Sequence, residues 1–400
     1  MLGNRVDRRT RAGLGAAVAG MLLIASTYGM ARFGVGLFAP HLTTQRPDLA
    51  GVLGWAAAAQ FTSYSLAAVL AARFVDRRPR AGLVLAGATA AVGCMGVAVA
   101  STPGAFVVAV FIGGMGGGFA SPALVPVIDA VISPHATATA QSVVNSGTAV
   151  GVIGAGIVAS TAASIGLAWV FMALLCAGTA VAAWYPVRAR AGLAASRRRT
   201  PGPSSEPAWA PWRFLVVPGI AAVIAGAGSS LIWTFGPLLI TDSGSVTSER
   251  VGWLWIALGL GGILGTLTGT LVQHTGTPGG WCFCAGVLSL AAAGVAVTVA
   301  AGSAWTAYTS MALFGAGYMG LSGVLILWAR HVWPSNAGAG TSVLFIALAT
   351  GQALGSAGFG LGQDVLSPVF LSALAASLCA AGGLTALLRK PRSSGREFTA

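Results

Sequence analysis

Charged side chains are scarce in this chain, and their scarcity excludes most classes of soluble protein. Only 8% of its 400 residues are Asp, Glu, Lys or Arg, whereas a water-soluble domain usually carries about 25%. Acids are rarest, with nine Asp and Glu against 22 Lys and Arg. Because 56% of the residues are hydrophobic, too little polar surface is left to coat a soluble globule.

Groups that could act in catalysis or hold a metal are also sparse. The five cysteines are scattered through apolar stretches and the four histidines are isolated, which predicts neither a disulfide framework nor a metal site. The sequence contains no H-E-x-x-H, no acid in the middle of an apolar stretch and no Walker phosphate loop. We therefore expect no enzyme activity, no cofactor, no metal and no ATP-driven pump.

Long uncharged stretches dominate what is present. Nine of them lack Asp, Glu, Lys, Arg and His: 12–31, 49–72, 81–128, 136–187, 214–241, 251–273, 275–329, 332–363 and 365–388. A membrane-spanning helix needs about 20 apolar residues, and three of these stretches are long enough for two crossings each. The sequence thus predicts an all-α integral membrane protein with twelve transmembrane helices. The 58 glycines would allow such helices to pack closely.

The basic residues are distributed unequally between the two sides of the predicted membrane domain. With twelve alternating crossings, 19 of the 22 Lys and Arg fall on one side. This bias is typical of cytoplasmic loops, so both termini and the central loop are expected to be cytoplasmic. The net charge of +13 is then a topology signal, and nucleic acid is not an expected partner.

The second half of the chain resembles the first at an offset of about 200 residues. Ala39-Pro40 aligns with Gly236-Pro237, and Gly151 aligns with Gly351. We predict a six-helix bundle over 1–187, a basic Pro- and Ser-containing cytoplasmic linker over 188–211, and a second six-helix bundle with a short basic tail over 212–400. Two such halves, related by pseudo-two-fold symmetry, would hold a substrate at their interface near the bilayer midplane.

Two loops in matching positions carry a recognisable pattern. The segment 72–80 reads ARFVDRRPR, and 269–276 reads GTLVQHTG. Together they resemble the G-x-L-a-D-r-x-G-r-k loop signature of the major facilitator superfamily. The resemblance implies a contact that stabilises one of two alternating states, made by Asp76, Arg77, Arg80, Gly269 and Gly276. The alternative is that 73–80 is only a basic cytoplasmic loop.

A further pattern, YGMARFG at 28–34, is similar to the G-x-x-R-F motif of the YbfB/YjiJ-like bacterial facilitators. The resemblance implies a monomeric secondary transporter in a bacterial plasma membrane. It would move a small solute, such as an organic anion or polar metabolite, by alternating access. A multidrug or metabolite efflux carrier and a non-transporting sensor of the same fold are the open alternatives.

Arg32 is the one strong base inside a predicted span. A charge there is costly unless it faces a cavity, so we expect it to attract an anionic or polar group of the substrate. The alternative is a structural Arg32 that snorkels to the interface. With a helix over about 13–38, Arg32 would lie roughly 9 Å from the helix centre.

Neutral polar and aromatic residues on other predicted spans could complete this site, or could instead be contacts between helices. They are Tyr28, Gln60, Tyr64, Gln141, Asn145, Trp233, Tyr318 and Gln352. Asp129 is the nearest candidate for proton coupling, although a wetted acid at a helix end explains it equally. Five tryptophans near predicted helix ends are expected in the interfacial belt: Trp253, Trp255, Trp281, Trp305 and Trp333.

Overall fold

The structure is a computed structural model, and it describes residues 14–75, 77–132, 137–189, 212–334 and 337–388. All regular secondary structure in these ranges is helical. Ten of the described segments are long and apolar enough to cross a membrane by length and composition. The prediction of an all-helical membrane protein is thereby confirmed.

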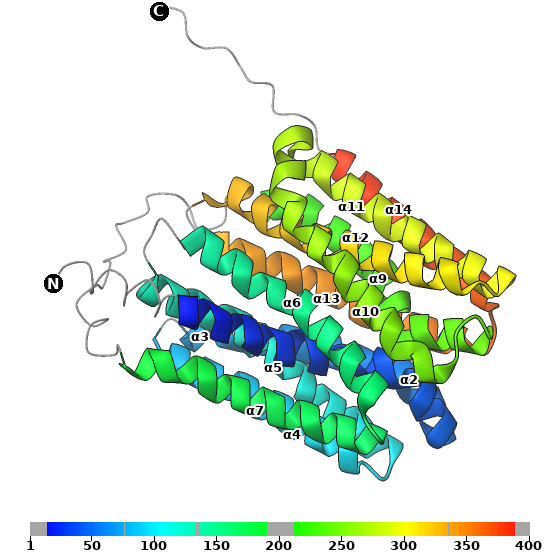
Figure 1. The fold of residues 1–400 in the computed structure, drawn as a ribbon. Helices are drawn as coiled ribbons and strands as arrows, with labels where there is room; N and C mark the ends of the chain where they lie inside the picture. The colour runs from blue at the N-terminus through cyan, green and yellow to red at the C-terminus, as the bar shows by residue number, and fades with distance from the viewer. Residues whose placement is uncertain (1–13, 76, 133–136, 190–211, 335–336, 389–400) are drawn as a thin grey trace, which may run out of the picture.

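Within the described ranges, most consecutive helices are joined by short connections (Figure 1). In chain order the helices are α2 (Gly34–Gln45), α3 (Leu53–Phe74), α4 (Pro79–Val99), α5 (Pro103–Val131), α6 (Thr137–Thr161), α7 (Ile165–Ala189), α9 (Trp212–Asp242), α10 (Val251–Ile263), α11 (Thr268–Ala301), α12 (Ala304–Val332), α13 (Ala337–Gly362) and α14 (Pro368–Thr385). Short helices of other types are η1 (Ala25–Ala31), η2 (Pro47–Val52), η3 (Ser248–Arg250), η4 (Leu264–Leu267) and η6 (Ala386–Leu388).

The first span is longer and less regular than the sequence predicts. The apolar segment covers Leu14–Gln45, and its α-helix changes to the π-helix η1 and is interrupted at Arg32 and Phe33. A residue at position 32 then lies only about 4 Å from the segment's centre at 1.5 Å per residue. The depth predicted for Arg32 is therefore corrected: it lies near the middle of the span. π-Helical turns are frequent at functional sites.

The helices form two packed groups. In the first, α4 packs on α5 and α7, and α5 also packs on α3. In the second, α11 packs on α12 and α14, and α9 packs on α13 and α14. Figure 1 shows the first group, coloured blue to green, lying against the second, coloured yellow-green to red. The groups meet where α3 packs on α13, α6 on α10 and α2 on α9.

Glycines make the closest contacts between the groups. A Cβ on Gly54 of α3 would meet the Ser356 carbonyl oxygen at 2.7 Å and the Gly360 Cα at 2.9 Å. A Cβ on Gly252 of α10 would overlap the Gly156 carbonyl oxygen of α6. These contacts gather toward the end of the molecule that contains η2 and η3, which we call the distal end.

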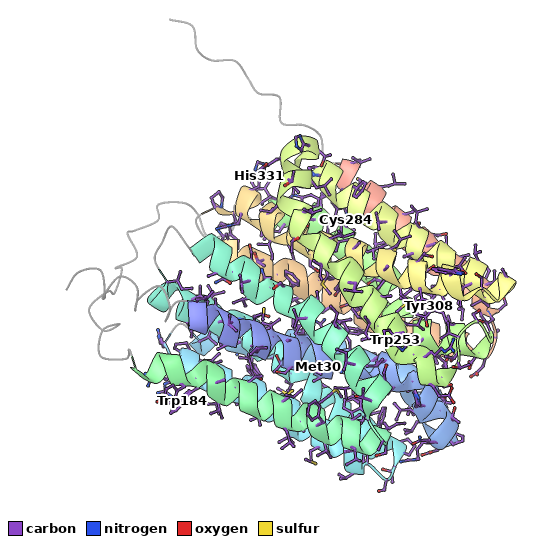
Figure 2. All side chains as sticks on the ribbon, in the orientation of Figure 1. Met30, Trp184, Trp253, Cys284, Tyr308 and His331 are labelled. Atoms are coloured by element: carbon purple, nitrogen blue, oxygen red, sulfur yellow. The ribbon has the colours of Figure 1, made fainter. Side chains whose placement is uncertain are left out.

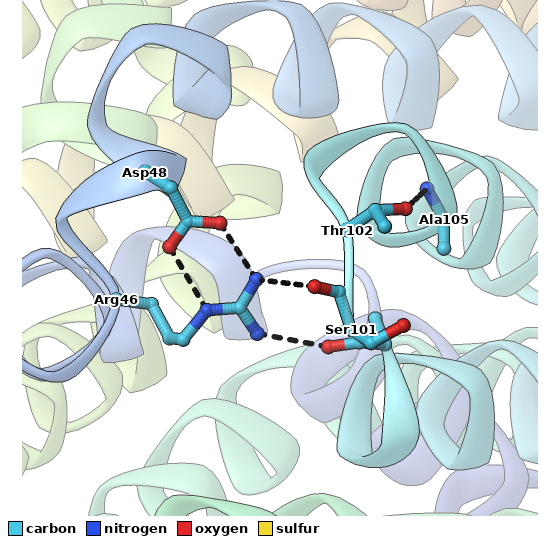
Figure 3. A network of polar contacts seen from close by, with 6 residues as sticks. Arg46, Asp48, Ser101, Thr102 and Ala105 are labelled. Atoms are coloured by element: carbon cyan, nitrogen blue, oxygen red, sulfur yellow. Dashed lines mark hydrogen bonds and ion pairs between the residues drawn. The ribbon is translucent and has the colours of Figure 1, made fainter.

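An ion pair ties two connections together at the distal end (Figure 3). Arg46 forms a bidentate pair with Asp48, at 2.9 and 2.7 Å. The same guanidinium donates to the carbonyl oxygens of Ala100 and Ser101, at 2.9 and 3.2 Å. One side chain thus fixes the connection that follows α2 against the connection that follows α4.

The tryptophan prediction is correct only in part. Trp253 and Trp305 are 56% and 83% exposed, as an interfacial belt requires. Trp255 and Trp281 are fully buried. Trp255 packs edge-on against Trp233, and Trp281 donates from Nε1 to the Gly382 carbonyl at 2.9 Å. Proximity to a helix end did not reveal which way these rings face.

Candidate functional site

Arg32 is buried at the centre of an aromatic cluster. Its side chain is 1% exposed, although Arg is almost never fully buried unless it is paired. The guanidinium carbon lies 3.9 Å from the ring centroid of Tyr64 and 4.4 Å from that of Tyr28. Phe61 and Phe33 follow at 5.2 and 5.3 Å. All four rings are within range for cation–π attraction.

Local structure brings these groups together. Arg32 and Phe33 lie in the break between η1 and α2, where the chain leaves helical geometry at Phe33 (φ −107°, ψ 5°). Within the preceding turn, the Thr27 hydroxyl donates to the Leu23 carbonyl at 2.6 Å. Such hydroxyl bonds compete with helical geometry. On α3, Phe61 and Tyr64 are three residues apart and share a helical face.

One polar chain connects Arg32 to the second group of helices. Arg32 Nη2 donates to Gln352 Oε1 at 3.2 Å, and Gln352 Nε2 donates to the Tyr318 hydroxyl at 3.1 Å. Gln352 and Tyr318 are 0% and 1% exposed. The charge on the first span is thus held by α13 and α12.

The cluster continues through stacked rings into the second group. Phe33 stacks on Trp233 of α9 with ring centroids 3.7 Å apart and 12° between the ring planes. Trp233 meets Tyr318 and Phe314 edge-on, at 5.0 and 5.2 Å. The Phe33–Trp233 stack therefore joins the first span to α9 directly beside the buried charge.

Some N–H donors of the Arg32 guanidinium are unused among the described residues. Among the residues that the structure describes, none is a hydrogen-bond partner of Arg32 Nε or Nη1, and no carboxylate forms an ion pair with Arg32. Removing a cation from water costs several kcal/mol even after relaxation. Four rings, at about 0.5–2 kcal/mol each, and one neutral hydrogen bond offset part of this cost. The site consequently carries net positive charge, unused N–H donors and apolar walls.

Most of the sequence-predicted site residues lie in this cluster. Arg32, Tyr28, Tyr64, Trp233, Tyr318 and Gln352 are joined by the contacts above. Gln60 lies at its edge, where Nε2 donates to the Ala31 carbonyl at 3.2 Å. Asn145 is exposed and Gln141 half-buried on α6, and neither forms a hydrogen bond with the described residues of the cluster.

Sequence reasoning missed the aromatic partners. Phe33, Phe61 and Phe314 complete the walls around Arg32 and Trp233. They were missed because a phenylalanine side chain has no polar atom that would single it out in an apolar span. Phe33 directly follows Arg32, and Phe61 is one turn from Tyr64, so helical spacing from a chosen polar residue could have found both.

The residues predicted for the loop signature lie in different structural environments. Asp76 lies outside the described residues, Arg77 is exposed, and Arg80 is half-buried in the first turn of α4. Gly276 interrupts α11 with φ 71°, a conformation that favours glycine, whereas nothing lies within 4 Å of a Cβ on Gly269. Asp129 is in the last turn of α5, and its side chain is outside the described part of the structure.

Comparison with known proteins identifies the family. No curated protein matches the chain. A family model described as Major Facilitator Superfamily matches residues 21–356, a range that contains the buried arginine and every aromatic residue around it. The chain therefore belongs to the major facilitator superfamily, a family of secondary membrane transporters rather than enzymes.

Proposed function

We propose that the protein moves a small organic anion across a bacterial plasma membrane by alternating access, with Arg32 binding the anionic group. One observation carries this proposal: Arg32 is buried between the two helix groups, and within the described part of the chain two of its nitrogens have no hydrogen-bond partner and no carboxylate pairs with it. A substrate carboxylate, sulfonate or phosphate could take up these donors. The surrounding rings favour a substrate with an apolar or flat body.

Twelve crossings are consistent with the helices. The helix α3 spans 22 residues, but Gln60, Ser63 and Tyr64 lower its hydropathy, and it is not among the ten apolar segments. The segment Ser248–Ala301 has 54 residues, about 80 Å if straight, which exceeds twice the 30 Å hydrocarbon core. A turn at Gly276, where α11 is non-helical, would make it two crossings. Adding these two gives twelve.

Equivalent contacts support two related halves. Gly151 on α6 would meet the Ala25 carbonyl, and its counterpart Gly351 on α13 would meet the Val223 carbonyl on α9. Counterparts here are 198 to 200 residues apart, in agreement with the sequence repeat. Interactions that recur in both halves support the proposed pseudo-two-fold relation.

The same relation extends to the contacts between halves. Gly54 meets Ser356 and Gly360, whereas Gly252 meets Gly156 and Ser160. Each partner of Gly252 is 200 residues before a partner of Gly54. Two symmetric glycine contacts therefore close the distal end.

The glycine contacts are looser toward the opposite end. Gly259 of α10 packs against Ile153 of α6, whereas a Cβ on Gly269 of α11, farther toward the opposite end, would have no described atom within 4 Å. Asn145 is exposed one turn before Ala149, which also contacts Gly259. We infer a state closed at the distal end, with Asn145 and Gln141 on the substrate's path to the opposite side.

Ligand-dependent stability tests the proposal. The purified protein is heated with organic anions, neutral sugars or organic cations, each at saturating concentration. A ligand at 100 times its Kd stabilises the protein by about 2.7 kcal/mol. We expect stabilisation by an anion in the native protein, its loss in Arg32→Gln and partial retention in Arg32→Lys. Arg46→Gln, a loss of charge far from the cluster, should retain it.

Other outcomes identify the alternatives. Stabilisation by cations alone, unchanged in Arg32→Gln, would refute the anion site and favour a multidrug efflux carrier. Anion binding without uptake into vesicles, with and without a proton gradient, would favour a sensor. Uptake of the stabilising anion, abolished in Arg32→Gln, is the result that the proposal requires.

A further inference from the structure

A groove of about 440 Å³ lies along α10 near the distal end, and none of its lining residues belongs to the Arg32 cluster. Its lining consists of Arg250, Trp253, Ile256, Ala257, Leu260 and Tyr308. Figure 2 shows Trp253 and Tyr308 near one another on the same side of the molecule. Trp253 and Leu260 are 56% and 55% exposed. In a membrane protein, such exposed apolar side chains face lipid.

The groove follows one face of a single helix. Trp253, Ile256, Ala257 and Leu260 have the i, i+3, i+4, i+7 spacing of one helical face. The small side chain of Ala257 forms the floor between two large ones, and Tyr308 of α12 forms a wall. From Arg250 to Leu260 the chain rises about 15 Å, half the thickness of the hydrocarbon core. The groove thus has the depth of one leaflet.

Its mouth is cationic and polar. Arg250 is exposed, ends η3, and has no recorded side-chain hydrogen bond or ion pair with any described residue. The adjacent Glu249 instead accepts from the Thr247 hydroxyl at 3.3 Å. Trp253, one turn below Arg250, and the exposed Trp305 at the start of α12 mark the level of the membrane interface.

We propose that this groove binds an anionic phospholipid of the distal leaflet. The lipid phosphate lies against the Arg250 guanidinium, whose planar fork matches phosphate oxygens. One acyl chain follows the face from Trp253 to Leu260. An anionic phospholipid fits because its phosphate complements the cationic mouth of the groove, and because the length of the groove matches one leaflet. The inference rests on membrane embedding and is independent of the proposed transport.

Fluorescence quenching by brominated lipid tests the site directly. The full chain is reconstituted in phosphatidylcholine vesicles with an equal mole fraction of brominated phosphatidylglycerol or brominated phosphatidylcholine. The contribution of Trp253 to the emission is obtained by subtracting the spectrum of Trp253→Phe from that of the native protein. We expect at least about twofold stronger quenching of Trp253 by the anionic lipid. Trp305, obtained from Trp305→Phe, is the matched control and should be quenched equally by both lipids.

Two groove variants separate charge from shape. Arg250→Gln should abolish the preference for phosphatidylglycerol, whereas Arg250→Lys should keep part of it. Ala257→Phe should fill the groove and lower quenching of Trp253 by both lipids. Unchanged quenching of Trp305 in each variant shows that the protein is folded and inserted. Equal quenching of native Trp253 by both lipids, or a preference that survives in Arg250→Gln, would overturn the proposal.

Discussion

Gly36 offers a direct test of alternating access, because adding one methyl group should disfavour only one state. Gly36 lies on α2 against α9, where a Cβ would overlap the Trp233 carbonyl oxygen and lie 2.9 Å from the carbonyl carbon. These are backbone atoms and cannot rotate away. Gly36→Ala must therefore push α2 and α9 apart at the distal end.

The expected size of the effect follows from the cost of overpacking, about 1–3 kcal/mol. Because α2 and α9 belong to different halves, the cost applies only while the distal end is closed. A penalty of about 2 kcal/mol changes the ratio of the two states roughly 30-fold. If the closed state is about tenfold favoured in the native protein, the open state becomes about threefold favoured in the variant.

Two other glycines provide matched controls. Gly315→Ala would overlap the Leu258 carbonyl oxygen, a contact between α12 and α10 within one half. It should lower thermal stability without shifting the ratio of states. A Cβ added at Gly219 would have no described atom within 4 Å, so Gly219→Ala should lower neither the thermal stability nor the ratio of the closed to the open state.

Spin-label distances measure the ratio of states. Labels are attached at Gln45 and Asp242, exposed residues at the ends of α2 and α9, in a background without the native cysteines. Gly36→Ala should add a population with a longer distance. An unchanged distance distribution in a folded Gly36→Ala protein, or the same shift in Gly315→Ala, would refute the reasoning.

Three further predictions concern single interactions. Pairing with Arg46 holds the pKa of the Asp48 carboxyl below its usual value. The ion pair therefore stabilises the folded protein at pH values above the usual Asp pKa of about 3.9, and this stabilisation is lost as the pH falls through the lowered pKa. The protection of the 46–52 amides against hydrogen exchange, relative to the intrinsic exchange rate at each pH, should then fall in acid, and Asp48→Asn should remove that dependence. Trp281→Phe removes the buried hydrogen bond from Trp281 to the Gly382 carbonyl, which still accepts from the Thr385 hydroxyl at 2.8 Å, and should cost about 0.5–1.5 kcal/mol, measured as a lower Tm. Gly276→Ala places a side chain at φ 71° and should cost about 1–2 kcal/mol, whereas Gly269→Ala should not lower the Tm; equal Tm values for the two would contradict this account.

The membrane-embedded helical fold could be predicted because lipid tolerates few charges. Uncharged stretches delimited nearly every helix, and Arg46 and Arg250 mark connections at the distal end. The irregular first span could not be predicted. Pro40 lies inside α2, which continues to Gln45, in a segment that packs on α9 and α6.

The candidate site was accessible to sequence reasoning only through its polar atoms. A lone arginine in an apolar span indicated a site, and the polar residues Gln60 and Tyr64 of the next predicted span indicated one wall. The burial of Trp255 and the stacking of Phe33 on Trp233 had no sequence signal, because an aromatic ring in a transmembrane helix can face lipid or protein equally well.

By itself, the sequence determined that the chain lies in a membrane, that it is helical, and that one buried cation needs a partner, because each follows from the cost of charge and unpaired backbone in hydrocarbon. The tertiary structure alone decided that Gln352, 320 residues away, is the neighbour of Arg32, and that Gly54 and Gly252 make close contacts between the two helix groups. In lipid there is no hydrophobic force that favours one helix face over another, so partners are selected by the fit of small residues and a few hydrogen bonds, which appear only when the helices are packed.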